Sequence, residues 1–516
     1  MSENRGQQES EGRPQLEEAL RLLMSRGLQV DADAFKILAE QSVDTNLIEV
    51  AETVLKQLQE AKEPVLFVTE EVVSEALVSC SPTDTEVGKT ETSKAMFKPF
   101  AKEVDSEIRV IRDPSVGLDS KGEFEYFLEY FRDRFDRVKR ILQQRLDARD
   151  ATPIHVALER PVNVEVKIVG IVTEKRETSR ATIIRIEDLD DRVTVIVPSG
   201  SARELRLKAR SLLIDQMVCI IGKNSGDGTI IASDVVVPDI PERKVERSSI
   251  AVMLALTSDL HVGSNTFLEG AFNQFTTWLH GRVGGERQRD ISGRVKYLVI
   301  AGDLVDGIGV YPDQERELSI ADIYGQYKKA GELIGEIPDY IEVVVIPGNH
   351  DAVRQALPQP AIPSEFVELL SAKRNVISLG NPSVVEIHGV RVLLFHGRSL
   401  EDVIRAVPGL SYNQPQKAME YLLKARHVAP TYGGNTPIAP ERIDHMIIED
   451  VPEIFHSGHV HVNGYETYRG TLIVNSGAWQ SQTDYQRRMG LMPTPGRVPI
   501  INLQDMHLAE LDFLST

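Results

Sequence analysis

Residues 341–351, IEVVVIPGNHD, contain a continuous apolar run followed by a short polar motif. A run of branched apolar residues without alternation is typical of a strand that is buried on both faces of a sheet. A Pro-Gly pair ends the run, and Asn349, His350 and Asp351 follow directly. Ligand sites in open α/β sheets form beyond the carboxyl ends of the strands. The stretch therefore predicts an α/β domain with a polar site at one edge of its sheet.

Four other apolar runs in the second half of the chain also end in short motifs rich in Asp and His. They are residues 250–256 before Asp259-x-His261, 297–301 before Gly302-Asp303-x-x-Asp306, 390–395 before His396-Gly397-Arg398, and 453–455 before His456-Ser457-Gly458-His459-x-His461. Each motif alone is weak evidence, but their occurrence together, in this order and each after a strand, is very rare by chance. We therefore expect the five strand ends to converge on one site.

The polar residues at these strand ends form a candidate set of metal ligands. The set is Asp259, His261, Asp303, Asn349, His396, His459 and His461. Imidazoles and oxygens without a thiolate suit divalent ions of intermediate hardness such as Mn, Fe or Zn, rather than a magnesium site or a Cys-rich zinc site. Two carboxylates against two divalent ions leave about two positive charges uncompensated by formal counting, and a phosphodiester would compensate them.

The composition restricts the class of protein. The chain has 516 residues, 41% hydrophobic and 26% charged, as in an ordinary globular protein of several domains. A net charge of −19 argues against non-specific coating of nucleic acid, but not against a nuclease that contacts phosphate through metal ions and a few arginines. Two cysteines are too few for a disulfide framework, and no apolar run approaches the roughly 18 residues of a membrane span. We expect a cytoplasmic, nucleoid-associated protein without membrane contact.

The part of the chain before residue 249 changes character several times. Apolar residues at helical spacing predict a small helical module, and a stretch rich in Thr and charge around residues 80–94 predicts a flexible tether. Apolar residues at three- and four-residue steps from Phe124 to Leu146 predict an amphipathic helix. We expect a multidomain α+β protein with a helical N-terminal module at 1–78, a flexible linker at 79–120, a connecting helix at 121–160, an OB-fold barrel at 161–241 and the α/β domain at 249–516.

The OB-fold is predicted from five short alternating segments, with a helical stretch between the third and the fourth. OB-folds often bind single strands by stacking bases on aromatic side chains, but residues 161–241 contain no aromatic residue. We therefore favour a structural or subunit-contacting role for this barrel over base stacking.

The motifs at the strand ends resemble those of the calcineurin-like metallophosphoesterase superfamily, over about half of the chain. The resemblance implies that residues 249–516 form a phosphoesterase α/β sandwich with two divalent metal ions, Mn being preferred to Fe or Zn. One ion would be held by Asp259, His261, Asp303 and His461, and the other by the bridging Asp303 together with Asn349, His396 and His459. His350 would be the acid that protonates the leaving oxygen.

The order of the domains extends the resemblance to nearly the whole chain. With the motifs at 309–312, 352–356, 395–399 and 475–480, it is similar to the small subunits of archaeal family D DNA polymerases. This implies a 3′-to-5′ proofreading exonuclease that acts on the 3′ end of a DNA primer and also scaffolds a large polymerase subunit. The sequence has no phosphate-cradling loop and no second carboxylate cluster, so we expect the polymerase active site in that other subunit.

Residues beside the ligands have both a functional and a structural interpretation. Arg354 and Arg398 would clamp a phosphate or the primer end, or else form surface ion pairs. Asp306 and Asp351 are expected to support the ligands through hydrogen bonds, whereas His456 either orients a ligand imidazole or packs in the core. Trp479 and Tyr485 would stack on a frayed base or, in the preferred interpretation, pack in the core. The remaining histidines, His155, His280, His388, His427, His445 and His507, are interpreted as structural or surface residues.

Two alternatives stay open. A non-catalytic assembly subunit would lack some of the ligands, yet every ligand position is filled. A double-strand-break repair nuclease or a cyclic-nucleotide phosphodiesterase of the same superfamily would not explain an OB-fold ahead of the catalytic domain. The sequence does not decide whether residues 504–513 contact a sliding clamp, and a terminal pair of β-strands over 500–514 is the simpler interpretation.

Overall fold

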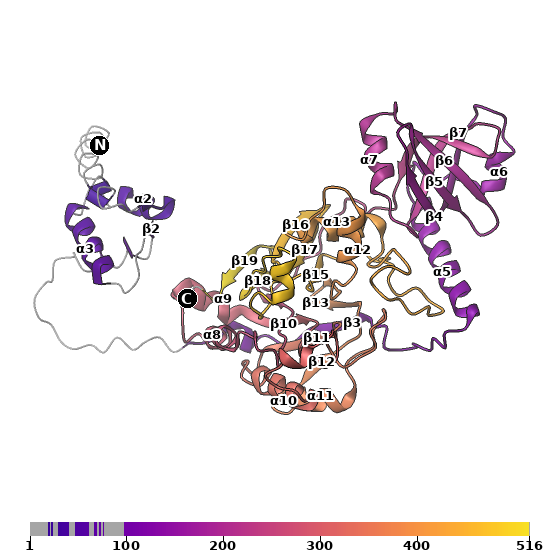
Figure 1. Ribbon diagram of the computed structural model, residues 1–516. Helices are drawn as coiled ribbons and strands as arrows, with labels where there is room; N and C mark the ends of the chain where they lie inside the picture. The colour runs from indigo at the N-terminus through magenta and orange to yellow at the C-terminus, as the bar shows by residue number, and fades with distance from the viewer. Residues whose placement is uncertain are drawn as a thin grey trace, which may run out of the picture. The chain divides into compact units, whose positions relative to one another are not determined.

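The computed structural model describes residues 97–514 throughout and, nearer the N-terminus, residues 19–20, 22–23, 29–40, 47–60, 67–69, 72–73 and 76. The chain divides into two compact units, Met1–Lys94 and Ala95–Thr516 (Figure 1). The expected tether around residues 80–94 lies outside the described residues. Among the described residues, no helix has both the length and the apolar character needed to cross a membrane.

The described part of the first unit contains helices and a very short sheet. The helices are α2 (Ala32–Glu40) and α3 (Leu47–Glu60), and the strands β1 (Gln29–Val30) and β2 (Phe67–Val68) pair in parallel. Leu38 on α2 and Val50 and Val54 on α3 are buried in one apolar cluster. Helical spacing of these residues places them on one face of each helix, so that the two faces can pack together.

The second unit contains two six-stranded sheets. One sheet has the order β12 (Val376–Ser378), β11 (Glu342–Ile346), β10 (Val295–Ala301), β9 (Met253–Thr257), β18 (Arg497–Asn502), β19 (Leu508–Asp512). The other has the order β16 (Gly464–Tyr468), β17 (Thr471–Asn475), β15 (Ile454–Ser457), β14 (Val390–Leu394), β13 (Ser383–Ile387), β3 (Ile108–Arg112). The predicted terminal strand pair is confirmed as the antiparallel β18 and β19.

The two sheets pack face to face, because one buried cluster takes apolar residues from both. On β10, Tyr297 and Val299 belong to this central cluster, whereas Leu298 and Ile300 belong to the cluster on the outer face. Alternation along a strand directs successive side chains to opposite faces, and here both faces are buried. Each large apolar side chain buried in this way contributes roughly 1.5–3 kcal/mol. This explains why the strand reads as an uninterrupted apolar run.

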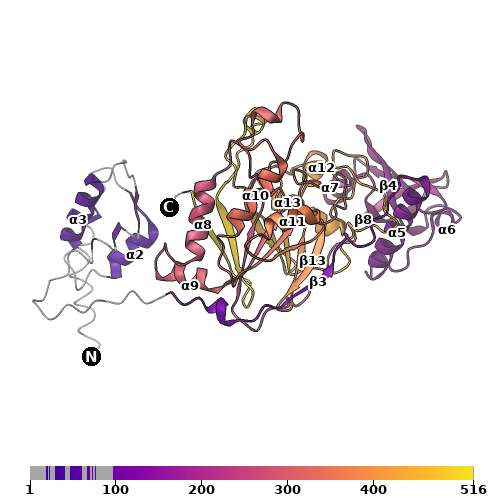
Figure 2. The same ribbon diagram turned by 90° about the horizontal axis from the view of Figure 1, so that it is seen from below.

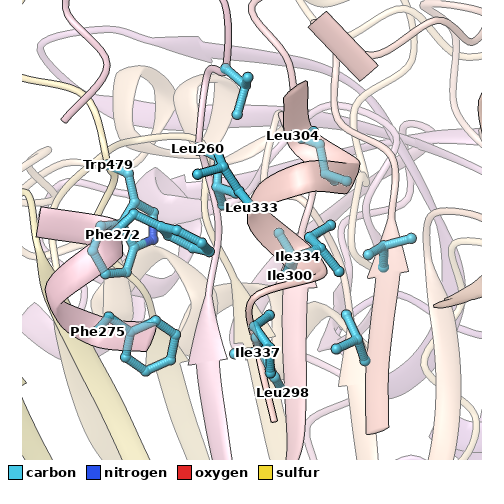
Figure 3. Packing of buried hydrophobic residues seen from close by; sticks show 14 of the residues in the cluster. Leu260, Phe272, Phe275, Leu298, Ile300, Leu304, Leu333, Ile334, Ile337 and Trp479 are labelled. Carbon is cyan, nitrogen blue, oxygen red and sulfur yellow. The ribbon is translucent and has the colours of Figure 1, made fainter. Parts of the chain in front are cut away.

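Helices cover the outer faces of both sheets (Figure 1). The first sheet is covered by α8 (Glu269–Leu279), α10 (Ile323–Ile334) and α11 (Ser364–Leu370), and the second by α12 (Leu400–Ala406) and α13 (Pro415–Ala425). Short elements between them are α9 (Glu286–Arg294), α14 (Asp484–Arg488), η1 (Phe100–Glu103) and η2 (Gln314–Arg316). Figure 3 shows Phe272 and Phe275 of α8 packed beside Trp479, which is 1% exposed. The preferred prediction that Trp479 packs in the core is therefore confirmed, whereas the same prediction for Tyr485 is wrong, because Tyr485 is 58% exposed.

A closed five-stranded barrel is formed by the strands that follow β3 and precede β9 in the sequence. Its strands are β4 (Glu165–Glu177), β5 (Ala181–Glu187), β6 (Arg192–Pro198), β7 (Met217–Asn224) and β8 (Thr229–Val236), in the closed order β4-β5-β6-β8-β7. Helix α7 (Arg203–Ser211) comes between the third and the fourth strand, and β6 pairs with β8 in parallel. The five predicted strands and the intervening helix are confirmed.

The expectation that residues 79–120 form a flexible linker is wrong for residues 108–112. These residues form β3, which pairs antiparallel with β13 at the edge of the second sheet (Figure 2). The segment is anchored further because Asp113 accepts a hydrogen bond from the backbone of Gly380 at 3.0 Å. An edge strand is held by backbone hydrogen bonds and does not need a buried face, so Val110 and Ile111 stay 45% and 37% exposed. Composition alone therefore did not reveal the strand.

The connecting segment at 121–160 contains two helices, α5 (Phe124–Gln143) and α6 (Ile154–Leu158). Helix α5 starts at the residue that the apolar spacing predicted but ends at Gln143, before the expected Leu146, which is 80% exposed. Phe135, Val138 and Leu142 pack against β4 and β7 of the barrel. The helix thus joins the barrel to the rest of the second unit.

Candidate metal centre

All five predicted strand ends lie at one edge of the stacked sheets. Strands β9, β10 and β11 run parallel in the first sheet, and β14 and β15 run parallel in the second. Because parallel strands end at the same edge, the motifs that follow them meet there. Strand β15 extends to Ser457, so His456 belongs to the strand and not to the motif after it. The structure brings all seven candidate ligands together at this edge.

One group of three residues, Asp259, His261 and His461, is able to hold a metal ion. His461 Nε2 lies 3.1 Å from His261 Nε2 and 3.4 Å from Asp259 Oδ1. All three side chains are buried, with exposed fractions of 7% or less. The resemblance assigns the same three residues, with Asp303, to one metal ion.

A second group, Asp303, His396 and His459, is also able to hold a metal ion. His396 Nε2 lies 3.3 Å from Asp303 Oδ2 and 3.3 Å from His459 Nδ1. Asn349 Oδ1 is 3.2 Å from the same His396 nitrogen. The Asp303 carboxylate is also 3.8 Å from His261 Nε2, so it lies between the two groups. A carboxylate in this position suits the bridging role that the resemblance gives Asp303.

The atoms of the two groups fit a pair of divalent cations. Ring nitrogens of neighbouring histidines face one another at 3.1–3.3 Å. Two nitrogens that both present a lone pair repel at this distance, so each pair needs a proton on one nitrogen or a cation between the two. Among the residues that the structure describes, no lysine or arginine forms an ion pair with Asp259 or Asp303, whose ionic contacts are with histidines. Buried carboxylates without a cationic side chain beside them are characteristic of metal sites.

The pKa values of the metal-free site reflect this crowding. Burial acts to raise the pKa of Asp303, but His396 and His350 outweigh it and hold that pKa well below its usual range. Burial is likewise outweighed at Asp259, where His461 lowers the pKa to about 2. For His396, burial acts to lower the pKa, but the charge of Asp303 raises it to about 9. Without metal, a proton on His396 therefore supplies part of the positive charge that a bound cation would supply.

The backbone of the motifs adopts conformations that aim the side chains at one point. Asp259, His261, Asp303, His459 and His461 all have positive φ values, between 51° and 71°. The left-handed region costs a residue other than glycine about 1–2 kcal/mol, and such residues cluster at functional sites. Gly348 is required for a different reason, because a Cβ atom there would lie 2.1 Å from Asp303 Oδ1.

His350 is oriented by the backbone of the neighbouring motif. Its Nδ1 lies 2.7 Å from the carbonyl oxygen of Asp306. A carbonyl oxygen only accepts, so Nδ1 carries a proton and donates it in this hydrogen bond. The backbone N–H of His350 donates to Asp303 Oδ1 at 2.8 Å. The ring is thus tied to the metal-binding segment, with Nε2 as the nitrogen left to exchange a proton.

Asp306 and Asp351 lie behind the candidate ligands. Asp306 Oδ1 is 3.1 Å from His261 Nδ1, and Gln314 donates to Asp306 Oδ2 at 2.9 Å. With His261 and His350, Asp306 also forms a third group able to hold a metal, although these hydrogen bonds already use both of its oxygens. Asp351 accepts from the backbone N–H of Gly348 at 2.8 Å, and burial followed by repulsion from Asp303 raises its pKa to about 6.

His456 and the two arginines contact protein groups. His456 Nε2 lies 3.0 Å from Ser476 Oγ within the core, where burial lowers its pKa to about 3. Arg354 forms an ion pair with Glu441 at 2.7 Å. The guanidinium of Arg398 donates to the backbone oxygen of Gln355 at 3.0 Å, and burial lowers its pKa against the opposing effect of Asp303. Of the two arginines, Arg398 therefore interacts electrostatically with the centre.

Two residues that support the ligands were not predicted from the sequence. Glu401 Oε1 on α12 lies 3.6 Å from His459 Nε2, and this contact lowers the pKa of Glu401. Gln486 on α14 lies with its Nε2 at 3.0 Å from His461 Nδ1. Both residues are on helices, so the motifs at the strand ends do not include them. The capping motif of α14, in which Thr483 accepts from the backbone of Gln486, was the only local signal.

A cavity of about 450 Å³ lies apart from this centre, on the barrel. Its lining includes Arg203, Arg206 and Arg210 of α7 and the turn between β4 and β5. It contains none of the candidate ligands.

The curated relatives of the chain agree with the sequence resemblance. A family model that describes the B-type subunits of DNA polymerases alpha and epsilon matches residues 254–462. The DNA polymerase II small subunit of Archaeoglobus fulgidus is 44% identical over 393 residues, covering 76% of this chain and 78% of that protein. The DNA polymerase II small subunit of Methanothermobacter thermautotrophicus is 42% identical over 409 residues, covering 79% and 84%. The solved structure of an archaeal phosphodiesterase aligns with 50% of this chain and 99% of its own, at 13% identity and a TM-score of 0.23.

Proposed function

The chain belongs to the family of archaeal DNA polymerase II small subunits, and we propose that it removes nucleotides from the 3′ end of DNA while supporting a large polymerase subunit. The observation that carries this proposal is the completeness of the metal centre. Six of the seven candidate ligands form two groups, Asp303 of the second group lies 3.8 Å from His261 of the first, and Asn349 lies 3.2 Å from His396. A purely structural subunit has no need to bury two carboxylates among four histidines with no lysine or arginine paired to them.

In this proposal Asp259, His261 and His461 hold one divalent ion, and Asn349, His396 and His459 hold the other, with Asp303 between them. Mn is proposed as the ion, with Fe and Zn as the alternatives that the same imidazole and oxygen ligands accept. Bound divalent ions would polarise the scissile phosphate and lower the pKa of an attacking water. The rest of the chemistry falls to the side chains of the chain itself.

His350 is proposed as the acid that protonates the departing 3′-oxygen. Its Nδ1 proton is held by the Asp306 carbonyl, so the proton for the leaving group resides on Nε2 of the imidazolium. Asp303 accepts a hydrogen bond from the backbone N–H of His350, and the carbonyl of Asp306 accepts one from its ring. These two contacts hold the ring beside the two groups of candidate ligands. General acid catalysis of this kind contributes roughly 10²- to 10⁴-fold. The 3′-to-5′ direction of digestion follows from the family resemblance and not from the ligand geometry.

The domain assignments are part of the same proposal. We assign the five-stranded barrel at 161–241 to the OB-fold, supported by its strand order and by the parallel pairing of β6 with β8. Residues 249–516 are assigned as the phosphoesterase domain, to which β3 at 108–112 adds an edge strand. The 1–78 region is assigned as a separate helical module. Arg398 is proposed to contact substrate phosphate, whereas Arg354 is assigned to its ion pair with Glu441.

The experiment is release of labelled nucleotides from the 3′ end of single-stranded DNA by the full chain with Mn²⁺, alone and with the large subunit. Asp303→Asn is expected to abolish metal binding and to lower the rate by at least about 10³-fold, because the shared ligand is lost. His350→Ala is expected to lower the rate by roughly 10²-fold or more while metal content stays unchanged. His155→Ala, an exposed histidine of α6, serves as the control and should behave as wild type.

The main rival is a non-catalytic assembly subunit. It predicts that wild type digests nothing, with or without the large subunit, while still binding that subunit in size-exclusion chromatography. Digestion that survives Asp303→Asn would point to a contaminating nuclease and would also overturn the proposal.

A further inference from the structure

An exposed surface beside the metal centre combines two tyrosines with an arginine. We call it the tyrosine platform; its residues are Arg405, Tyr412 and Tyr485. Tyr485 is 58% exposed on α14, Arg405 is exposed on α12, and Tyr412 is half-buried in the loop after α12. Arg405 lies on the same helix as Glu401, which faces His459, and Tyr485 directly precedes Gln486, which contacts His461. Both therefore lie beside the same His459-x-His461 motif.

Two separate contacts connect the platform to the metal centre. On one side, Arg405 Nη2 donates to Glu401 Oε2 at 3.2 Å, and the other oxygen of Glu401 lies 3.6 Å from His459 Nε2. On the other side, Gln486, which follows Tyr485 directly on α14, lies 3.0 Å from His461 Nδ1. One residue therefore lies between the platform and each histidine of the motif, Glu401 next to His459 and Gln486 next to His461.

The segment around Tyr485 carries two further exposed apolar side chains. Met489 and Met492 are 53% and 66% exposed, within seven residues of Tyr485. Thr483 and Gln486 form a capping box that holds the start of α14. Exposed apolar side chains that gather on an ordered segment mark a binding surface, and methionine adapts to ligands of differing shape.

We propose that the tyrosine platform binds the bases at the 3′ end of single-stranded DNA, with Tyr485 and Tyr412 as stacking surfaces and Met489 and Met492 at the margin. This inference rests on the proposed function, because it supplies the base contacts that a centre specific for phosphate lacks. Stacking on aromatic rings accepts any base, which suits an enzyme that must remove whichever nucleotide stands at the end. Arg405 contributes positive charge for the phosphate backbone and a planar face for a base.

The absence of aromatic residues from the barrel strengthens this choice of occupant. Residues 161–241 contain no Phe, Trp or Tyr, so the barrel offers no ring on which a base can stack. Trp479, the other aromatic residue near the motifs with a possible stacking role, is 1% exposed and donates its Nε1–H to Thr257 at 2.6 Å. Of Trp479 and Tyr485, only Tyr485 thus remains available to a ligand.

The test compares two single-stranded oligonucleotides, one normal and one with abasic sugars at its last three positions, digested by the full chain with Mn²⁺. Tyr485→Ala is expected to lower kcat/KM for the normal end by roughly 5- to 150-fold, the range found for loss of one base stack. For the abasic end it should change little, because no base is there to stack. Tyr485→Phe keeps the ring and should restore digestion. Tyr465→Ala, a tyrosine on β16 that is 45% exposed and outside the platform, is the matched control.

An equal loss on both substrates would overturn the inference, because Tyr485 would then act by positioning Gln486 and not by holding a base. Unchanged digestion of both would overturn it as well. If wild type digests neither substrate, the proposed nuclease fails, and fluorescence anisotropy of the same oligonucleotides still tests the platform. Wild type should bind the normal oligonucleotide more tightly than the abasic one, and Tyr485→Ala should remove that difference. Equal binding of the two oligonucleotides by wild type would reject the platform independently of catalysis.

Discussion

The second unit contains two buried clusters of aspartate and histidine that have opposite properties. One is the metal centre around Asp303 and His396. The other, which we call the Arg134 cluster, consists of Arg134 on α5 with His427 and Asp444. In both clusters a histidine ring lies beside a carboxylate, at 3.3 Å for His396 and 2.8 Å for His427. Yet the pKa of His396 is raised to about 9, whereas that of His427 is lowered to about 4.

The difference comes from the charges beside each ring, because Asp303 and Asp259 both act on His396, whereas His427 has Arg134 beside it as well as Asp444. Burial acts to lower the pKa of both rings, and at His427 the charge of Arg134 adds to burial. Arg134 donates to Asp444 at 2.7 Å and to the carbonyl of Pro430 at 2.7 Å, and it also bonds Tyr130. His427 Nδ1 accepts from the backbone of Ala429 at 3.0 Å. Every polar group of the Arg134 cluster therefore has a protein partner, and its charge is balanced without an ion.

The metal centre has the same kinds of residues but no arginine or lysine paired with its two ligand carboxylates. Its histidines face one another, so a proton or cation must come from outside. The comparison shows that a buried Asp–His pair is not in itself a functional signal. The signal is the missing positive side chain, because an uncompensated buried carboxylate is stable only when something else supplies the charge.

The largest expected effect comes from breaking the Arg134 cluster. Arg134→Met leaves Asp444 buried without its cation and should lower the free energy of unfolding by about 3–5 kcal/mol. Chemical denaturation followed by circular dichroism measures this effect, and metal content should not change. Arg185→Met, which removes an exposed ion pair with Glu174, is the control and should leave the denaturation midpoint unchanged. A small effect of Arg134→Met would mean that His427 takes up a proton and replaces the arginine.

The second effect is a dependence of stability on pH that the Arg134 cluster imposes. His427 has a pKa of about 4 in the folded protein and an ordinary value of 6.5, so protons bind the unfolded chain more readily. Its contribution to stability is therefore complete above pH 6.5 and is lost as the pH falls through about 4, with a total of about 3 kcal/mol. Denaturation at pH 8, 6 and 4.5 measures it. His427→Gln should make the free energy of unfolding depend less on pH. The same pH dependence in the variant and in wild type would refute its assignment to His427.

The smallest effect concerns the carboxylate behind the metal centre. Glu401→Gln removes the charge that faces His459 Nε2 and should weaken Mn²⁺ binding by about 10- to 100-fold, because such partners orient and polarise a ligand imidazole. Titration calorimetry with Mn²⁺ measures the change. Asp402→Asn is the matched control, since Asp402 accepts from the backbone of Asn435 and Thr436 and faces no ligand. Equal Mn²⁺ affinities of Glu401→Gln and wild type would mean that Glu401 pairs with Arg405 and does not influence the ligand His459.

Much of the architecture could be predicted because it is encoded locally. The apolar run at 341–346 and the motif after it are adjacent in the chain, so the position of the candidate ligand Asn349 at a strand end follows from the covalent sequence. The barrel strands were recognisable for the same reason, since alternation over a few residues reports a strand that is buried on one face. Parallel strands then place separate motifs at one edge.

Other features required contacts between distant parts of the chain. Strand β3 joins a sheet through β13, which lies more than 270 residues later in the chain. The residues of β3 do not alternate between buried and exposed, so its sequence shows no strand periodicity. Glu401 and Gln486 reach the centre from helices, where their own neighbours give no sign of a histidine nearby.

By itself, the sequence determined which residues stand at the strand ends and which chemistry they can perform, because strand periodicity and motif order are properties of short stretches. Only the tertiary structure decided which histidine is basic and which is neutral. His396 and His427 look alike in the sequence, and both lie beside an aspartate in the fold. Whether an arginine from a distant helix completes the group depends on long-range packing, and that packing sets the local charge and therefore the pKa.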